Sequence, residues 1–319
     1  MNTKSPTRFT WRYIRNKIIS TLALIVGAVV LIFGMRTWWD LLWVMPFWFL
    51  CLFFWQAVQA VHPRRPGIIK RTTPAQFGLE YEDVRFPARD GVNLAGYFLK
   101  GVRPETIILA HGSGGGAVTL TPHAKFLFKA GYSVLMVDLR AHAHSEGNTI
   151  DGVQEINDIL GAVDYLHTRP ELAPDRIGAL GVSLGAHTVL HAALQSGSIR
   201  ALVLEGIGPA CLEDHGGRPT TMRRKINYPF NWMTYKLGDL IAGTSPASNT
   251  SAMKSLRRPL LIIAAGRGKE SYFSKLLFDA ASEPKLFWEV PQARHAAGYF
   301  EDPKTYVDRV VSFFDAYLT

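Results

Sequence analysis

Cysteine is scarce in this chain, and acidic residues are almost missing from its first 71 positions. Only two cysteines occur among the 319 residues, and one of them, Cys51, lies in an apolar run. This scarcity argues against a disulfide framework and favours a reducing compartment. Residues 1–71 contain ten Lys or Arg and one acid, Asp40, whereas residues 72–319 contain 25 residues of each sign. The net charge of +9 therefore belongs to the N-terminal segment, and no nucleic-acid partner is expected.

The N-terminal segment contains two long apolar runs. Residues 18–35 carry no charge, and residues 41–61 have only Gln56 and Gln59 as polar interruptions. Each run is long enough to cross about 30 Å of hydrocarbon as a helix. The connection, residues 36–40, has room only for a tight turn. We therefore expect two transmembrane helices that form a hairpin.

Basic residues flank both runs. They precede the first run within residues 1–17 and follow the second at Arg64, Arg65, Lys70 and Arg71. The positive-inside rule then predicts a multi-pass protein with both termini and the following domain in the cytoplasm, and we expect a bacterial inner membrane. A cleaved signal peptide is the first alternative, although no Ala-x-Ala-like site follows the first run. A hairpin that lies in the membrane interface without crossing is the second. Residues 62–78 contain Pro and Gly repeatedly, which predicts a linker.

From residue 79 onward, short apolar segments alternate with helical patterns. Glu80–Ala88 and Gly91–Lys100 predict an antiparallel opening hairpin. Six further strands are expected at Thr106–Ala110, Tyr132–Asp138, Arg176–Gly181, Arg200–Glu205, Pro259–Ala265 and Lys285–Val290. Their continuous apolar runs indicate burial on both faces. Residues 79–319 therefore predict an α/β domain with a mostly parallel sheet, whose active site lies at the carboxyl ends of the strands.

A serine follows the third of these six strands in the sequence Gly181-Val-Ser183-Leu-Gly185. An apolar strand precedes the motif and a helical segment follows it, so the serine lies on a sharp strand-to-helix turn. Such a turn leaves almost no room for side chains two residues before and two after the serine. It exposes the Ser183 hydroxyl at a helix N-terminus, where negative charge is favoured. A chance match is the alternative, but the required strand and helix are both present.

A serine nucleophile needs donors for the oxyanion that forms in the reaction. The glycine-rich loop His111–Gly116 directs backbone N–H groups toward the space above Ser183. We take the amides of Ser113 and Leu184 as the candidates for the oxyanion hole. A phosphate-binding loop is the rival interpretation, but the Gly-Lys-Ser/Thr ending is missing.

The serine also needs a base and an acid. His295, just beyond the last strand, is the candidate base. The expected acid lies in the loop after the seventh strand, where no Asp occurs and Glu270 is the nearby carboxylate. Glu205, at the end of the sixth strand, is the alternative acid. Its other interpretation is a hydrogen bond that fastens the floor of the site.

Four other histidines form two close pairs. His187 and His191 have a spacing that suits a metal, but they lack the Glu of His-Glu-x-x-His, so we expect them to be packed side chains. His142 and His144 are expected to be structural or to line the rim of the site. We predict neither a metal nor a cofactor.

Several of these motifs together resemble the α/β-hydrolase superfamily. The resemblance covers about residues 80–319 and is greatest to the esterase, dienelactone-hydrolase and serine-aminopeptidase-like branches. It rests on Asp90-Gly91, His111-Gly112, the Gly-Tyr-x-Val-x-x-x-Asp segment ending at Asp138, Gly181-x-Ser183-x-Gly185 and the surroundings of His295.

The resemblance implies an eight-stranded, mostly parallel sheet with helices on both faces and a lid after the sixth strand. It also implies that Ser183 is the nucleophile, His295 the base and Glu270 the acid, with Ser113 and Leu184 as the oxyanion hole. The chain departs from the family in two places. Ala141 and Ala143 stand where the family often has glycine, and Glu270 replaces the commoner Asp.

The expected lid, residues 206–254, mixes basic and aromatic side chains. These residues are Arg218, Arg223, Arg224, Lys225, Tyr228, Phe230, Trp232 and Tyr235. The mixture suits an anionic membrane surface, and it equally suits a lid helix with a solvated face.

These features together predict a membrane-anchored serine hydrolase. It would cleave a carboxylic ester or thioester of an apolar acid through an acyl-enzyme, without a cofactor. The expected partners are a small-molecule acyl substrate and the lipid bilayer. Acyl transfer or peptidase activity at the same site, and an inactive membrane-bound binding module, are the alternatives.

Overall fold

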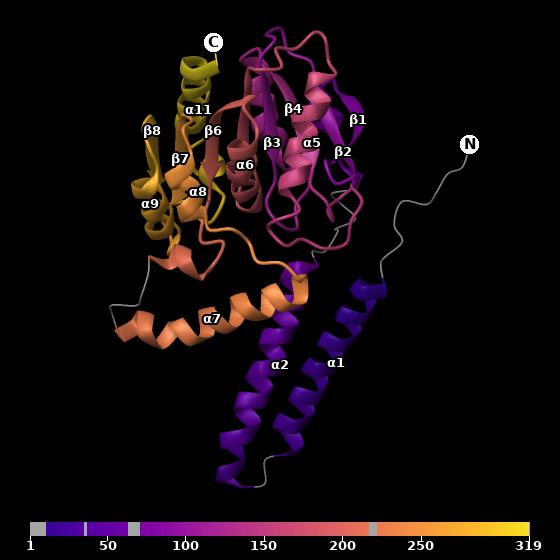
Figure 1. The fold of residues 1–319 in the computed structure, drawn as a ribbon, viewed down its shortest axis with the longest axis vertical. Helices are drawn as coiled ribbons and strands as arrows, with labels where there is room; N and C mark the ends of the chain where they lie inside the picture. The colour runs from indigo at the N-terminus through magenta and orange to yellow at the C-terminus, as the bar shows by residue number, and fades with distance from the viewer. Residues whose placement is uncertain (1–10, 35–36, 63–70, 217–221, 319) are drawn as a thin grey trace, which may run out of the picture.

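The computed structural model describes residues 11–34, 37–62, 71–216 and 222–318. Part of the predicted basic N-terminus (residues 1–10), part of the predicted linker (residues 63–70) and Arg218 of the predicted lid lie outside the described residues. In Figure 1 an α/β domain forms the upper part of the molecule, and two long helices extend from it.

The α/β domain is built on one mixed sheet of eight strands. Their order across the sheet is β1-β2-β4-β3-β5-β6-β7-β8. β2 runs antiparallel to both β1 and β4, and all other neighbours are parallel. The bounds are β1 (Glu82–Pro87), β2 (Asn93–Leu99), β3 (Thr106–Ala110), β4 (Ser133–Asp138), β5 (Ile177–Val182), β6 (Ile199–Glu205), β7 (Leu260–Ala265) and β8 (Lys285–Val290). The predicted α/β-hydrolase sheet is therefore confirmed, with every strand within three residues of its predicted bounds.

Helices cover both faces of the sheet (Figure 1). One face packs against α5 (Ile156–His167), α6 (Leu184–Gln195), α8 (Asn249–Ser255) and α9 (Glu270–Ala280). The other packs against α4 (Thr121–Lys129) and α11 (Pro303–Leu318). The short helices η2 (Pro74–Phe77), η3 (Ala117–Leu120), η4 (Leu212–His215) and α10 (Gly298–Glu301) lie in the connections. The central strands β3, β4, β5 and β7 are buried along their whole length, as their continuous apolar sequences predict.

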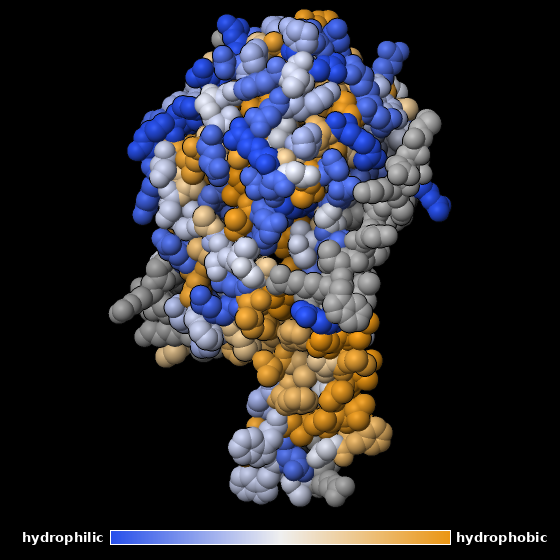
Figure 2. Space-filling model, turned by 45° about the vertical axis from the view of Figure 1, so that its right-hand side comes forward, coloured by the Kyte–Doolittle hydropathy of each residue, from blue (hydrophilic) through white to orange (hydrophobic). Residues whose placement is uncertain are grey.

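The two long helices lie side by side and expose apolar side chains. They are α1 (Trp11–Phe33) and α2 (Leu41–Val61), joined through η1 (Trp38–Asp40). Trp43 is 80% exposed and Phe33 is 75% exposed. Figure 2 shows the resulting hydrophobic surface over the hairpin, below a domain whose surface is mostly polar.

Among the described helices, one segment is long and apolar enough to cross a membrane, namely Leu41–Gln59 in α2. The apolar part of α1 is shorter, Lys17–Phe33, because basic residues occupy the first turns of that helix. The predicted span 41–61 thus has a structural counterpart. The predicted span 18–35 stays a prediction.

The segment after β6 holds the predicted lid. Its main element is α7 (Met222–Ala242), which in Figure 1 lies across the base of the domain and meets the domain-proximal end of α2. Ala57, Val58 and Val61 of α2 are buried in a small apolar cluster with Ile241 of α7. The lid is therefore packed against the hairpin, a contact that the sequence did not predict.

Candidate active site

Ser183 lies at the turn between β5 and α6 with a strained backbone. Its φ of 55° and ψ of −112° are unusual for a residue with a side chain. A Cβ at Gly181 would lie 2.3 Å from the carbonyl oxygen of Gly185, and a Cβ at Gly185 would lie 2.1 Å from the carbonyl oxygen of Ala110. Both glycines are therefore required by close backbone contacts, as the motif predicts.

The structure brings Ser183, His295 and Glu270 together. The Nε2 atom of His295 lies 2.9 Å from the Ser183 Oγ, and its Nδ1 atom lies 2.5 Å from an oxygen of Glu270. With a proton on Nδ1, the imidazole donates to the carboxylate and can accept the serine proton at Nε2. The arrangement has the geometry of a nucleophile, a base and an orienting acid.

Glu270 is fixed where β7 ends and α9 begins. Its second carboxylate oxygen accepts a hydrogen bond of 2.6 Å from the backbone N–H of Ala265, the last residue of β7. The carboxylate is 9% exposed, whereas the His295 side chain is 59% exposed. The acid is thus held by the sheet, and the base lies on an open turn above it.

The hydrogen bond that His295 donates to Glu270 raises the pKa of His295 above its ordinary value, while partial burial acts in the opposite direction. A raised pKa means that the imidazolium is stabilised relative to the neutral ring. That property suits a histidine that takes a proton during bond formation and returns it later.

Glu205, the alternative acid, makes different contacts. One of its oxygens accepts from the backbone N–H of Gly298 at 2.7 Å, and the other accepts from the Tyr306 hydroxyl at 2.8 Å. Gly298 begins α10, directly after the turn that carries His295. Glu205 therefore fastens the floor of the site, which was its second interpretation from sequence.

The candidate oxyanion donors flank the serine. Leu184 is the first residue of α6, so its N–H belongs to those that lack an intrahelical acceptor. Ser113 follows Gly112, and a Cβ at Gly112 would lie 3.3 Å from the Cβ of Ser183. The loop after β3 therefore packs directly against the serine, and the donor roles of Ser113 and Leu184 stay predictions.

Two histidines hold this loop in place. His142 was expected to be structural or to line the rim, whereas the sequence assigned no such role to His111. His111 donates from Nδ1 to the carbonyl of Gly112 at 2.8 Å and accepts at Nε2 from the N–H of Leu139 at 3.1 Å. His142 accepts at Nε2 from the N–H of Gly114 at 3.0 Å. Burial lowers the pKa of His111, which keeps its ring neutral for these bonds.

The loop after β4 explains one departure from the resembled family. Ala141 and Ala143 have positive φ angles of 61° and 33°, a conformation that glycine adopts without strain. The neighbouring Arg140 is buried and its guanidinium binds the carboxylates of Asp90 and Asp158. This ion-pair network anchors the loop in spite of the two alanines.

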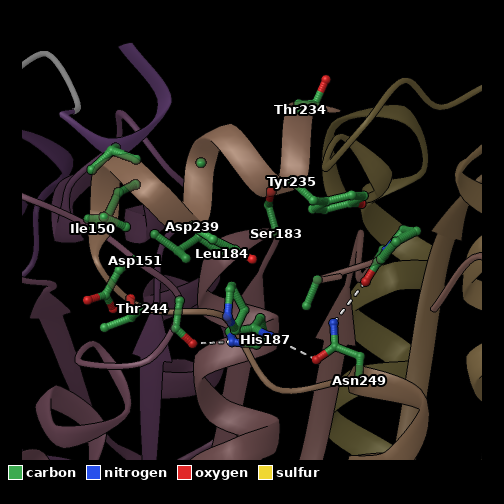
Figure 3. Close-up of a pocket in the computed structure, with 18 of the residues that line it drawn as sticks. Ile150, Asp151, Ser183, Leu184, His187, Thr234, Tyr235, Asp239, Thr244 and Asn249 are labelled. Carbon is green, nitrogen blue, oxygen red and sulfur yellow. Dashed lines mark hydrogen bonds between the residues drawn. The ribbon is translucent and has the colours of Figure 1, made fainter. Parts of the chain in front are cut away.

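Ser183 and His295 open onto a cavity of about 520 Å³ between the domain, α2 and α7 (Figure 3). Its floor contains His187, whose Nδ1 lies 2.8 Å from the Asn249 Oδ1 and whose Nε2 lies 2.6 Å from the Gly152 carbonyl. His191 also binds Asn249, at 3.0 Å. The histidine pair is thus packed against polar partners, as expected from the sequence.

Sequence reasoning missed the cavity residues that come from the hairpin and the lid. Ala57 and Val61 of α2 line the cavity together with Tyr235 and Ala242 of α7. Small apolar residues in a membrane-type helix give no local signal of a pocket, so their role emerges only from the packing of distant segments.

Known proteins share both the sequence pattern and the fold. The chain is 35% identical over 127 residues to the uncharacterized protein YfhR of Salmonella typhi, which is 38% of this chain and 41% of that protein. It is 32% identical to the thiohydrolase aneE of Aspergillus aculeatus over 128 residues. This stretch covers 39% of this chain and 40% of that protein. The matched stretch therefore spans about two fifths of the length of these relatives.

Among solved structures, the esterase Pf2001 of Pyrococcus furiosus superposes with a TM-score of 0.66 at 25% identity, over 82% of this chain and 99% of the esterase. The family described as X-Pro dipeptidyl-peptidase (S15 family) matches residues 67–275, well over half of the chain. The chain therefore belongs to the S15 family and to the α/β-hydrolase superfamily.

Proposed function

We propose that this protein is a membrane-anchored serine hydrolase that cleaves a carboxylic ester or a thioester of an apolar acid. The observation that carries the proposal is the pair of hydrogen bonds that links Ser183, His295 and Glu270 at the mouth of a cavity. The similarity to an esterase and to a thiohydrolase supports the choice of ester or thioester over other acyl derivatives.

In the proposed reaction, the Ser183 Oγ attacks the acyl carbonyl carbon while the Nε2 atom of His295 takes the hydroxyl proton. The oxyanion accepts hydrogen bonds from the amides of Ser113 and Leu184. The tetrahedral intermediate collapses, and His295 returns the proton to the departing alcohol or thiol. A water molecule, deprotonated by His295, then attacks the acyl-serine ester. His295 returns that proton to the departing Ser183 Oγ as the acid is released.

The membrane anchor in this proposal is the hairpin of α1 and α2. Its support is the length and apolar composition of Leu41–Gln59, together with the exposed apolar side chains on both helices. Basic residues near both ends of the hairpin favour a cytoplasmic location for the termini and the catalytic domain.

The proposed nucleophile is tested by labelling with a fluorophosphonate probe in native membranes. We expect the wild-type protein to be labelled and Ser183→Ala to lose labelling completely. Ser312→Ala, which removes an exposed hydroxyl on α11, is the matched control and should be labelled like the wild type. Persistent labelling of Ser183→Ala would show that another residue is the nucleophile. Absence of labelling in the wild type would favour the binding-module alternative.

A peptidase is the second candidate, because the family match is described as X-Pro dipeptidyl-peptidase. The same triad would then attack the amide bond after proline. Hydrolysis of glycyl-prolyl-aminomethylcoumarin and of p-nitrophenyl esters by the full-length protein separates the two functions. We expect kcat/KM for the esters to exceed that for the amide. The reverse order would favour the peptidase, and ester formation with an added alcohol would indicate acyl transfer.

A further inference from the structure

The cavity beside Ser183 is closed on one side by the membrane hairpin. Ala57 and Val61 are one helical turn apart on α2, and both face the cavity. Gly238 and Ala242 of α7 have the same spacing and line the cavity as well. The wall is therefore formed by one face of each helix.

This wall is attached firmly to the catalytic domain. The carbonyl of Val61 accepts a hydrogen bond of 2.8 Å from the N–H of Ile150, and Ile150 itself lines the cavity. The next residue, His62, is fully buried and contacts the carbonyl of Asn148 through Nδ1 at 2.9 Å. The end of α2 thus has a defined position relative to Ser183.

The wall suits a hydrocarbon chain. Its residues near α2 are apolar, and several polar groups deeper in the cavity already have partners in the protein, although the Thr244 Oγ1 has none among the described residues. One oxygen of Asp151 accepts from the N–H groups of Val153 and Gln154, for example, and both ring nitrogens of His187 have polar neighbours. A volume of about 520 Å³ lies within the range of small-molecule sites.

The wall also lies where the membrane segment ends. Leu41–Gln59 has the length of a membrane span, and Ala57 and Val61 occupy its last turns and the turn beyond. Close to this point, the ring of Phe53 on α2 lies 6.0 Å from that of Phe230 on α7. The cavity beside Ser183 therefore lies next to the end of the apolar segment of α2.

We propose that α2 is the acyl-chain wall of the active site, that Ala57 and Val61 set the chain length accepted, and that the substrate is an acyl ester resident in the bilayer. This inference rests on the proposed function, because it assigns a substrate class to the same serine. It makes the hairpin a determinant of specificity in addition to an anchor.

The test is the chain-length profile of the full-length protein in phosphatidylcholine vesicles, measured with p-nitrophenyl acetate and p-nitrophenyl palmitate. Ala57→Phe fills the part of the cavity beside α2. The kcat/KM for palmitate should therefore fall about tenfold, which is the effect of excluding two methylene groups, while the kcat/KM for acetate should change less than about twofold. Leu50→Phe, at an exposed position on the same helix, is the control and should leave both values unchanged. Val61→Ala enlarges the cavity and should raise the ratio of kcat/KM for palmitate to kcat/KM for acetate about threefold.

An unchanged ratio of the two esters in both Ala57→Phe and Val61→Ala would overturn the inference while leaving the hydrolase intact. If Ala57→Phe loses both activities through misfolding, the ratio measured for Val61→Ala decides alone. A wild-type protein that hydrolyses neither ester would overturn the proposed function itself.

Discussion

Around Ser183, the α/β domain fixes each reactive group by hydrogen bonds to the ends of buried strands. Glu270 is held by the last residue of β7, and Glu205 holds the segment after His295. By contrast, α2 and α7 meet mainly through apolar side chains such as Val58 and Ile241. Directional bonds fix positions to a fraction of an ångström, whereas apolar packing fixes shape and volume.

The two regions therefore have different expected roles: the hydrogen-bonded region supports the chemical step, and the apolar region selects the substrate. Substitutions in the hydrogen-bonded region should reduce turnover for every substrate, because they disturb groups that act on the reacting atoms. Substitutions in the apolar region should change which substrates react and leave the chemical step intact. Each of the following predictions tests one side of this division.

The largest effect is expected for Glu270→Gln. The amide cannot stabilise the imidazolium of His295, so kcat should fall by about 10²–10⁴-fold for short and long esters alike. The hydrogen bond that His295 donates to Glu270 raises the pKa of His295, and the base acts only when neutral. Its loss should therefore move the acid limb of the kcat/KM profile to lower pH.

Steady-state kinetics between pH 5 and 9 measure both effects. Glu301→Gln removes the charge of an exposed carboxylate near the same turn and serves as the control. A Glu270→Gln protein with normal turnover would identify a different acid.

A smaller effect is expected for Glu205→Gln. The amide weakens the bonds to Gly298 and Tyr306, so the His295 turn becomes less well positioned. We expect the free energy of unfolding to fall by about 1–3 kcal/mol and kcat to fall about fivefold, with no dependence on chain length. Thermal unfolding in detergent and ester kinetics test this. A loss of turnover as large as that of Glu270→Gln would show that Glu205 acts in the chemistry.

On the apolar side, Phe230→Ser combined with Trp232→Ser tests a proposed contact between α7 and the membrane. Both side chains are about half exposed, so they are available to a lipid surface. Activity on vesicle-bound palmitate ester should fall about threefold to tenfold, and activity on soluble acetate ester should stay the same. Equal losses on both substrates would contradict the division between chemistry and selection.

The smallest effect concerns Glu155, which binds the N–H groups of Asp151 and Gly152 beneath the cavity. Burial and the nearby acids raise the pKa of Glu155 to about 8. Between its ordinary pKa and this value, the folded protein keeps a proton that the unfolded chain releases, so stability falls as pH rises. Glu155→Gln cannot ionise and should reduce the fall in Tm between pH 5 and pH 8 by several degrees in thermal melts. An identical slope in both proteins would show that this carboxyl is not the source.

The sequence predicts the sheet and the nucleophile because their signals are local. Continuous apolar runs identify β3, β5 and β7, and two glycines at fixed spacing identify the turn at Ser183. The choice between Glu270 and Glu205 depends on which carboxylate reaches His295 in space. Both follow or end neighbouring strands, so spacing alone leaves both open.

The contact between α2 and the domain is harder to predict. Ala57 and Val61 have the composition expected in an apolar membrane span, and no sequence pattern near them predicts a contact with Ile150 or with α7. Association between segments that are about 90 residues or more apart depends on complementary shape, which a single sequence does not display. The bounds of the first apolar run are also hard to predict. The basic start of α1 and its apolar end belong to one continuous helix, so the helix begins before the apolar run does.

The strained turn at Ser183, the carboxylate at Glu270 and the imidazole at His295 occur in this order along the chain, and α2 precedes all of them. During synthesis α2 is therefore made before the sheet, and of the three reactive groups the histidine is made last. A nascent chain that already holds the serine and the hairpin still lacks its base. The proposed insertion of α2 into a bilayer is thus separated in time from the proposed hydrolysis of an acyl ester at Ser183.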